Sequence, residues 1–289
     1  MVEKICVVTG GNSGVGFETS RLLAESGARV VLVCRDQERG QMAMTRIKGD
    51  VPSARVSLEV ADLASLAQVR DLSARLLQAL PSLDLLVNNA GVVRAEHEKT
   101  EDGFEKTMAV NHLSHFLLTH LLLSKMIDSG GRVINVSSEA HRRSRLSPDT
   151  LEDALLGPAR YNGMQAYSHS KLANILFTSE LARRHTAGEL STCSVHPGVL
   201  ATRIWNQNRN LLSFLMVLLK PTMGRPSTGG KSVAHLAGQP AEFVHGRYFN
   251  KKREAWPAPP ARDKALARSL WKLSTDLTGL STQAVPSAE

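Results

Sequence analysis

The chain has 289 residues, of which 42% are hydrophobic, 21% are charged and only 4% are aromatic, and its formal net charge is +8. Length and composition fit one globular domain with one large core better than two small domains. The basic charge lacks the interleaved aromatic residues and the recognisable module of a nucleic-acid-binding protein, so we expect no nucleic-acid partner.

The sequence predicts neither a membrane anchor nor a metal site. The first residues, Met1 to Lys4, lead directly into an apolar strand, which leaves no room for a signal peptide. The longest apolar run, Leu211 to Leu219, is much shorter than the ~20 residues of a membrane-spanning helix. Cys6, Cys34 and Cys193 lie in apolar runs without metal-ligand spacing, so we expect buried reduced thiols and a cytoplasmic location.

Apolar runs alternate with helical patterns along the chain. From the N-terminus, strands are predicted at Ile5–Thr9, Arg29–Cys34, Arg55–Glu59, Leu83–Val87, Arg132–Ser137, Ser191–Val195 and Arg247–Phe249, and helices at Phe17–Ala24, Asp36–Lys48, Leu66–Leu80, Phe104–Ile127 and Gln165–His185. The strands are nearly continuous runs of Val, Ile and Leu, which is typical of strands buried on both faces. The alternation predicts an α/β fold, a doubly wound parallel sheet of about seven strands with helices on both faces. We assign residues 1–281 to this single domain and the small, polar residues 282–289 to a disordered tail.

A glycine-rich turn follows the first predicted strand and opens the first helix. Its sequence is Thr9-Gly10-Gly11-Asn12-Ser13-Gly14-Val15-Gly16. Glycines let the main chain turn tightly and approach a pyrophosphate, which the N–H groups and the dipole of the helix N-terminus then stabilise. Because the turn lies between a strand and a helix, it predicts a dinucleotide-binding site.

The end of the second predicted strand indicates which dinucleotide binds. The chain reads Val33-Cys34-Arg35-Asp36 and lacks an acidic residue at the strand end, where NAD-binding folds hold the ribose hydroxyls. The guanidinium of Arg35 can bind a 2′-phosphate in a bidentate fork. Asp36, one residue later, is better placed to cap the following helix. We therefore predict NADP(H), the alternative being that Arg35 is only a surface charge.

Tyr167 and Lys171 lie four residues apart on a predicted helix and therefore share one face. A tyrosine has a pKa of about 10, and a nearby positive charge lowers this value because it favours the phenolate. Such a tyrosine can donate or accept a proton in a reaction near neutral pH. Ser137 and Ser138 end the fifth predicted strand, and neighbouring residues of a strand point to opposite faces.

Together the motifs resemble the short-chain dehydrogenase/reductase family over nearly the whole chain, which implies a Rossmann fold and an oxidoreductase. In the family's order, the chain contains the glycine turn, Asp62-Leu63, Asn88-Asn89-Ala90-Gly91, Asn111, Ser138, Tyr167 with Lys171, and Pro197-Gly198. The segment Asn135–His141, the 28 residues between Ser138 and Tyr167 and the end of the chain are similar to the retinol-dehydrogenase-like branch, in which the second serine acts. Many animal members of that branch have an N-terminal membrane segment, which we do not expect in this chain.

The resemblance implies a role for each matching residue. The tyrosine moves the proton, the lysine supports it and binds the nicotinamide ribose, the serine orients the substrate carbonyl, and the asparagine holds a water of the proton relay. These catalytic residues are Asn111, Ser138, Tyr167 and Lys171. Contacts with NADP(H) are assigned to Gly10, Asn12, Ser13, Gly14, Val15, Gly16, Arg35, Asp62, Leu63, Asn89, Ala90, Gly91, Tyr167, Lys171, Pro197, Gly198, Val199 and Thr202.

The segment of residues 203–225 bears on the substrate because it follows the predicted nicotinamide turn and contains the apolar run Leu211–Leu219. As a lid, it would give an apolar pocket, which favours a hydrophobic aldehyde, ketone or alcohol. Dependence on NADPH favours carbonyl reduction. The alternatives for this segment are packing on the core or in a homodimer, and peripheral contact with a membrane surface.

Other functions use similar residues. A non-catalytic dinucleotide-sensing or scaffold protein could keep this fold, but the intact set of four catalytic residues argues against it. A sugar-nucleotide epimerase or dehydratase has related Tyr/Lys chemistry, but generally a longer chain and a different glycine spacing. Reduction of another bond, such as an activated double bond, stays open on the residues alone.

Overall fold

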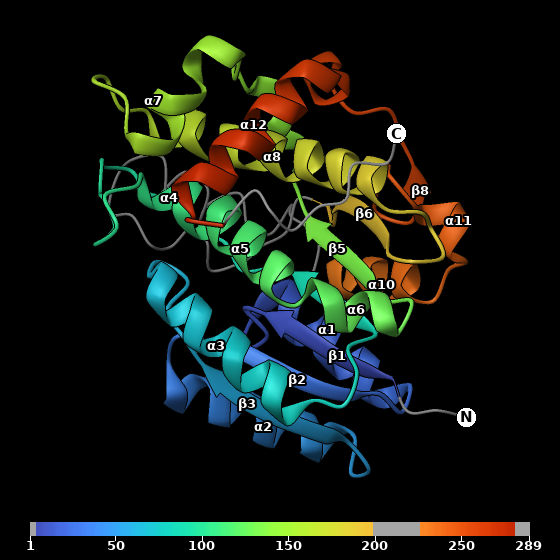
Figure 1. Cartoon of the computed structure of the whole chain (residues 1–289). Helices are drawn as coiled ribbons and strands as arrows, with labels where there is room; N and C mark the ends of the chain where they lie inside the picture. Colours follow the sequence, from blue (N-terminus) through green and yellow to red (C-terminus); the bar gives the residue numbers. More distant parts are fainter. Residues whose placement is uncertain (1–3, 199–225, 281–289) are drawn as a thin grey trace.

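The computed structural model describes residues 4–198 and 226–280, and in this part of the chain eight strands form one sheet (Figure 1). The strands are β1 (Ile5–Thr9), β2 (Arg29–Cys34), β3 (Arg55–Val60), β4 (Leu85–Asn88), β5 (Arg132–Val136), β6 (Ser191–His196), β7 (Arg247–Asn250) and β8 (Arg253–Glu254). Their order is β3-β2-β1-β4-β5-β6-β7-β8. The pairs from β3 to β7 are all parallel, which confirms the predicted doubly wound parallel sheet.

The sheet has one strand more than the seven predicted. The extra strand, β8, has two residues and pairs antiparallel with β7 at the edge of the sheet. It follows a tight turn in which Lys251 adopts a positive φ of 58°. A strand of two charged residues has no apolar pattern, which is why the sequence did not predict it.

The order of the strands reverses between β1 and β4, because β2 and β3 lie on one side of β1 and β4 to β7 on the other. In open α/β sheets, ligands bind outside the carboxyl ends of the strands at such a reversal. The predicted glycine turn after β1 and the segment Asn88–Gly91 at the end of β4 both lie at this point. The topology therefore brings them to one edge of the sheet.

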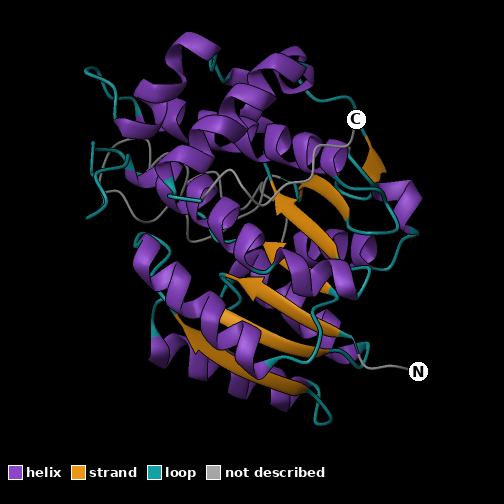
Figure 2. Cartoon of the chain, viewed as in Figure 1, coloured by secondary structure: helices purple, strands orange, loops and turns teal. Residues whose placement is uncertain are grey.

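Helices cover both faces of the sheet (Figure 2). The longer ones are α1 (Gly14–Glu25), α2 (Gln37–Asp50), α3 (Leu66–Ala79), α5 (Ser114–Leu121), α8 (Gly163–Arg184), α10 (Pro226–Ala237) and α12 (Lys264–Leu277). The shorter elements are α4 (Lys106–Met108), α6 (Leu123–Asp128), α7 (Leu151–Leu156), α11 (Ala241–Val244), the π turn η1 (Ala109–Leu113) and the 3-10 turns η2 (Glu139–Arg143), η3 (Pro148–Thr150) and η6 (Pro259–Arg262).

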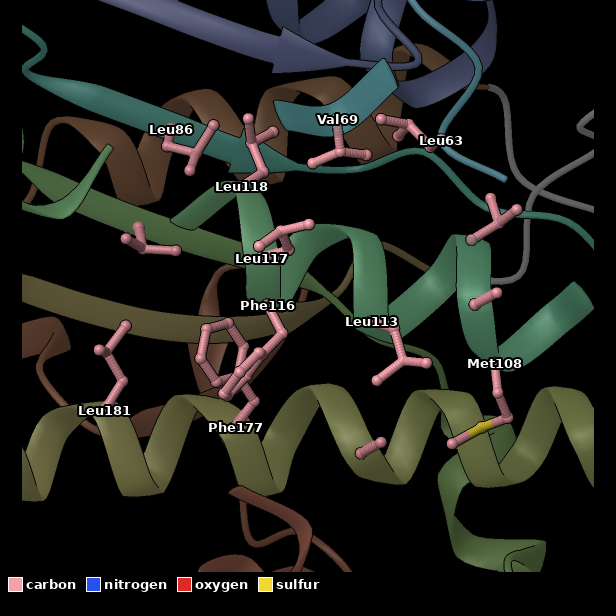
Figure 3. Packing of buried hydrophobic residues seen from close by; sticks show 14 of the residues in the cluster. Leu63, Val69, Leu86, Met108, Leu113, Phe116, Leu117, Leu118, Phe177 and Leu181 are labelled. Carbon is pink, nitrogen blue, oxygen red and sulfur yellow. The ribbon is translucent and has the colours of Figure 1, made fainter. Parts of the chain in front are cut away.

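Alternation along the central strands produces two hydrophobic cores. In β1, Val7 joins the core that contains α3, α5, α8 and α12, whereas Cys6 and Val8 join the core that contains α1, α2 and α10. Successive side chains of a strand point to opposite faces, so an uninterrupted apolar strand supplies both cores. Phe116 of α5 and Phe177 of α8 pack in the first core with ring centroids 5.3 Å apart (Figure 3).

The predicted helix Phe104–Ile127 is wrong as one continuous helix. The structure divides it into α4, the π turn η1, α5 and α6, with a break at Leu122. A π turn widens the helix by one residue and is commonly found at functional sites. The buried carboxylate of Glu105 caps the start of this region through the N–H groups of Thr107 and Met108.

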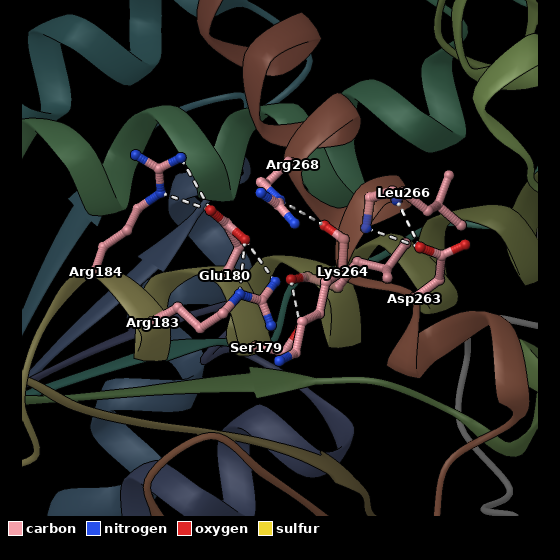
Figure 4. A network of polar contacts seen from close by, with 10 residues as sticks. Ser179, Glu180, Arg183, Arg184, Asp263, Lys264, Leu266 and Arg268 are labelled. Carbon is pink, nitrogen blue, oxygen red and sulfur yellow. Dashed lines mark hydrogen bonds and ion pairs between the residues drawn. The ribbon is translucent and has the colours of Figure 1, made fainter. Parts of the chain in front are cut away.

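Helix α12 lies against α8, and each of the two helices carries its own polar contacts (Figure 4). Glu180 of α8 forms ion pairs with Arg183 and Arg184. The guanidinium of Arg184 also lies 4.2 Å above the ring of Trp271 in α12. Because Tyr167 and Lys171 belong to α8, these contacts fix the helix that carries them.

Candidate active site

The glycine turn between β1 and α1 forms a backbone cradle. Gly10 and Gly14 have φ values of +65° and +58°, which other residues adopt only with strain. A Cβ on Gly16 would lie 2.3 Å from the Gly10 carbonyl oxygen and 2.4 Å from Asn89 Nδ2. The Ser13 side chain makes no capping bond to the first turn of α1, so it leaves the N–H groups there to an anion.

Thr9 bonds the glycine turn to the segment Asn88–Gly91. Its Oγ1 accepts hydrogen bonds from the N–H groups of Asn89 (2.9 Å) and Ala90 (3.0 Å), and Asn89 Nδ2 donates to the Thr9 carbonyl (2.7 Å). Asn88, in contrast, is turned into the sheet, where its Nδ2 donates to Asn135 Oδ1 (2.8 Å). A Cβ on Gly91 would lie 3.5 Å from Lys171 Nζ, so this loop reaches the reacting residues.

Arg35 and Asp36, at the end of β2, differ in their surroundings. The Asp36 carboxylate caps α2, since it accepts a hydrogen bond from the N–H of Arg39 (3.0 Å), as the sequence predicted. Arg35 is exposed and makes no ion pair with another described residue. Arg39, whose guanidinium lies 3.3 Å from the Asp36 carboxylate, is a second guanidinium close to this strand end and was not among the predicted site residues.

Asp62 and Leu63 follow β3, and both make contacts within the fold. Asp62 Oδ1 accepts a hydrogen bond from Ala64 N (2.9 Å), and its own N–H donates to Gln68 Oε1 (2.9 Å). The Leu63 side chain is buried in the first core (Figure 3). Any contact of Leu63 with a ligand therefore involves its main chain.

The structure brings Tyr167, Lys171, Ser138 and Asn111 to one place. Tyr167 and Lys171 lie on α8 and are buried, and the Tyr167 hydroxyl is hydrogen-bonded to Ser138. Lys171 Nζ donates to the Val136 carbonyl (3.0 Å) and lies 5.6 Å from the centroid of the Tyr167 ring. The Ser137 hydroxyl, in contrast, donates to the Lys171 carbonyl (2.7 Å) and so faces the main chain of α8.

Burial controls the protonation of this cluster. It raises the pKa of Tyr167 to about 12, and the hydrogen bond with Ser138 opposes this shift. Burial also lowers the pKa of Lys171 to about 8. The spacing of Tyr167 and Lys171 predicts that the lysine charge lowers the tyrosine pKa, but in this arrangement removal of the tyrosine from water is the larger effect.

Asn111 lies in the π turn, and its side chain is fully bonded. Its Oδ1 accepts from Val92 N (2.7 Å), while its Nδ2 donates to Val92 O (3.0 Å) and to Ser170 Oγ (2.9 Å). Its main-chain carbonyl accepts a hydrogen bond from Nδ1 of His115 (3.1 Å). His115 and Thr9 were not among the predicted site residues, because their partners are far away in the sequence.

Pro197 and Gly198 directly follow β6 and precede residues 199–225, which lie outside the described part of the chain. Pro197 is buried and Gly198 has a φ of +105°. Beside them, burial lowers the pKa of the His196 imidazole to about 4. The predicted cofactor residues Val199 and Thr202, the segment of residues 203–225 and the tail of residues 282–289 lie outside the described residues.

Comparison with known proteins agrees with this geometry. The family model of the short chain dehydrogenases matches residues 4–147. Human retinol dehydrogenase 11 is 40% identical over 279 residues, which cover 96% of this chain and 86% of that protein.

Two solved structures have the same fold. A structure of an uncharacterized protein from Mycobacterium paratuberculosis has a TM-score of 0.75 and 32% identity, with 96% of this chain and 94% of that chain covered. The blue fluorescent protein from a metagenomic library, solved in complex with NADPH, has a TM-score of 0.67 and 29% identity, with 86% and 95% covered.

The chain belongs to the short-chain dehydrogenase family, in its retinol-dehydrogenase-like branch. The family confirms the Rossmann fold expected from the sequence, and its members in this branch are oxidoreductases. Among the described helices, none is long and apolar enough to cross a membrane.

Proposed function

We propose that the protein is an NADP(H)-dependent oxidoreductase that transfers a hydride between nicotinamide and a hydrophobic carbonyl or alcohol, with reduction of an aldehyde or ketone favoured. One observation carries the proposal. Tyr167 and Lys171 of α8, Ser138 after β5 and Asn111 of η1 come from three separate parts of the chain, yet they meet beside the glycine cradle at the reversal of strand order.

The residues present fit a dinucleotide. The close approach of Gly16 to the Gly10 carbonyl leaves no room for a side chain, so the turn keeps the backbone shape that a pyrophosphate requires. The exposed Arg35 and the use of Asp36 as a helix cap favour a 2′-phosphate over free ribose hydroxyls. The NADPH complex of the metagenomic blue fluorescent protein supports the same choice. When bound, the cofactor supplies or accepts the hydride.

The chain's own residues then supply the proton. The Tyr167 hydroxyl donates to the carbonyl oxygen of the substrate, and the Ser138 hydroxyl, bonded to it, orients the same oxygen. The Lys171 ammonium, with its pKa lowered to about 8, can release and recover a proton close to physiological pH.

The hydrophobic substrate is inferred from two features. Human retinol dehydrogenase 11, which is 40% identical to this chain, is named for retinol, a hydrophobic alcohol. The segment Leu211–Leu219, which lies outside the described residues, is apolar and follows the predicted nicotinamide turn. A lid function for residues 203–225 and a cytoplasmic location belong to the same proposal, and the alternatives for this segment are packing on the core or in a homodimer, and peripheral contact with a membrane.

Consumption of NADPH with a panel of carbonyls, from small aldehydes to steroids, retinal and aromatic ketones, tests the proposal. We expect turnover with the apolar members, and we expect Tyr167→Phe to abolish turnover while NADPH still binds, because the ring stays in place. Arg35→Ala should weaken NADPH binding and leave NADH binding nearly unchanged. Absence of turnover across the panel would favour a non-catalytic dinucleotide sensor. Turnover of conjugated double bonds alone would favour an enzyme that reduces activated double bonds. Activity retained by Tyr167→Phe would refute the mechanism.

A further inference from the structure

His115 lies between the nucleotide cradle and the reacting cluster. It belongs to the first turn of α5, directly after the π turn, and only 1% of it is exposed. Its Nε2 is 2.9 Å from Thr9 Oγ1 at the end of β1, although the two residues are 106 positions apart in the sequence. Its Nδ1 is 3.1 Å from the main-chain carbonyl oxygen of Asn111. One ring thus contacts both halves of the site.

The partners of the ring determine where its hydrogen is. A carbonyl oxygen can only accept, so Nδ1 of His115 carries the hydrogen. Burial lowers the pKa of this imidazole to about 4, so the ring is neutral at physiological pH and Nε2 has a lone pair. The Thr9 hydroxyl therefore donates to Nε2. The other acceptor within reach of that hydroxyl, the Val87 carbonyl, is farther away at 3.2 Å.

The fixed direction of the Thr9 hydroxyl has a consequence for the cradle. Its single hydrogen is given to His115, so both lone pairs of Thr9 Oγ1 are free to accept from Asn89 N and Ala90 N. A continuous series of hydrogen bonds then runs from the loop beside the glycine turn, through Thr9 and His115, to Asn111 in the π turn. Each bond fixes the orientation of the next.

We propose that His115 is a positioning residue, which couples the geometry of the nucleotide cradle to that of the reacting cluster through a neutral ring with its hydrogen on Nδ1. This inference rests on the proposed function, since it assigns His115 a role in the same site. The effect of His115 is exerted through Thr9 and the Asn111 carbonyl.

The same helix provides a matched control. His120 also bonds through Nδ1 to the carbonyl four residues before it, that of Phe116 (2.7 Å), and it also packs against aromatic rings. Its Nε2 has no hydrogen-bond partner among the described residues. His120 thus has the local contact of His115 without the connection to Thr9.

Three variants separate the two contacts of His115. In His115→Asn, the side-chain amide can still donate to the Asn111 carbonyl, but it does not reach Thr9. In His115→Gln, the longer amide can accept from Thr9, while the contact with Asn111 is lost. His115→Phe keeps the approximate ring volume and removes both bonds. His120→Phe is the control for loss of a histidine from the same helix.

Binding of NADPH by fluorescence titration and steady-state kinetics provide the readouts. We expect His115→Asn to weaken NADPH binding roughly 10-fold, as for loss of one buried hydrogen bond, with a smaller effect on kcat. His115→Gln should lower kcat more than NADPH affinity, and His115→Phe should lower both NADPH affinity and kcat. His120→Phe should keep both values within about twofold, even if its urea midpoint falls.

Equal changes of NADPH affinity and kcat in the Asn and Gln variants would overturn the coupling, as would values unchanged in all three. If His115→Phe fails to fold, the other two variants decide the question. Nitrogen-15 spectra of the wild-type histidines test the assignment directly, and a neutral His115 ring with its hydrogen on Nε2 would overturn it. Both the spectra and the NADPH titration can be measured even if no carbonyl is turned over. Failure of the proposed function is therefore distinguishable from failure of this inference.

Discussion

Substitution of Gly16 by alanine should damage the cofactor site much more than the fold. Gly16 is in the first turn of α1, where an alanine would ordinarily stabilise the helix by about 0.5–1 kcal/mol. Its new Cβ would lie 2.3 Å from the Gly10 carbonyl oxygen, whereas ordinary contact begins at 3.4 Å. The obstructing atom belongs to the backbone, so the turn itself must move by about 1 Å.

The expected magnitudes follow from this displacement. Overpacking typically costs about 1–3 kcal/mol, so a net loss of roughly 1–2 kcal/mol of folding free energy remains after the gain in helix propensity. A shifted turn misplaces the N–H groups that would bind the pyrophosphate. A hydrogen bond to a charged group contributes about 1.5–3 kcal/mol, so loss of one weakens NADPH binding roughly 10- to 150-fold.

Fluorescence titration with NADPH and urea denaturation measure the two effects separately. Gly49→Ala is the matched control, since Gly49 lies in α2 and a Cβ there would meet nothing within 4 Å. That variant should bind NADPH normally and gain stability. NADPH affinity in Gly16→Ala within a factor of two of the wild type would refute the argument that this glycine is required by the cradle.

Two further predictions concern stability. The Arg132 guanidinium at the start of β5 donates to the carbonyls of Leu236 (2.5 Å), Ala237 (3.1 Å) and Gln239 (2.8 Å) at the end of α10. Arg132→Met should therefore cost about 2–3 kcal/mol in urea unfolding, and a loss below about 0.5 kcal/mol would contradict this capping role. Burial lowers the pKa of His112 to about 3 and those of His115 and His120 to about 4. Below pH 6.5 the unfolded chain binds protons that these folded histidines do not, so stability is fully present above that pH and falls as the pH drops toward 4. Each histidine should lower the free energy of unfolding by about 1 kcal/mol between pH 7.0 and 5.5. Urea unfolding at the two pH values measures this loss, and His120→Gln should lose less unfolding free energy than the wild type. Equal stability at both pH values would be inconsistent with the prediction.

The strands of the sheet could be predicted closely because their pattern is local. β2, for example, consists of Arg29 and the uninterrupted apolar run Val30–Cys34, and its predicted bounds are confirmed. The division of the helix after Phe104 could not be predicted in this way. It depends on bonds such as that between Asn111 and Val92, which join residues far apart in the sequence. The spacing of the apolar residues alone predicts one continuous helix through this point.

Other differences have different causes. Helix α12 was not predicted, although its signals were present, since Asp263 caps it and Leu266, Leu270 and Trp271 follow at helical spacing. The spacing of the motifs and the family resemblance were enough to predict the candidate site residues from the sequence. The connection between Thr9 and His115 was not, because no local pattern relates a strand end to a helix that begins more than a hundred residues later.

The separation of the two hydrophobic cores by the sheet has a consequence for how such an enzyme can diversify. Helix α1, which opens at the cradle, packs in one core, and α8, which carries Tyr167, packs in the other. Substitutions in distant, non-contacting positions usually have additive effects on stability. Sequence drift in the core behind α1 can therefore leave the packing of α8 unchanged. The reverse holds for the core behind α8, so the packing of the two faces can change largely independently, and the bond between Thr9 and His115 is a point at which the two faces stay connected.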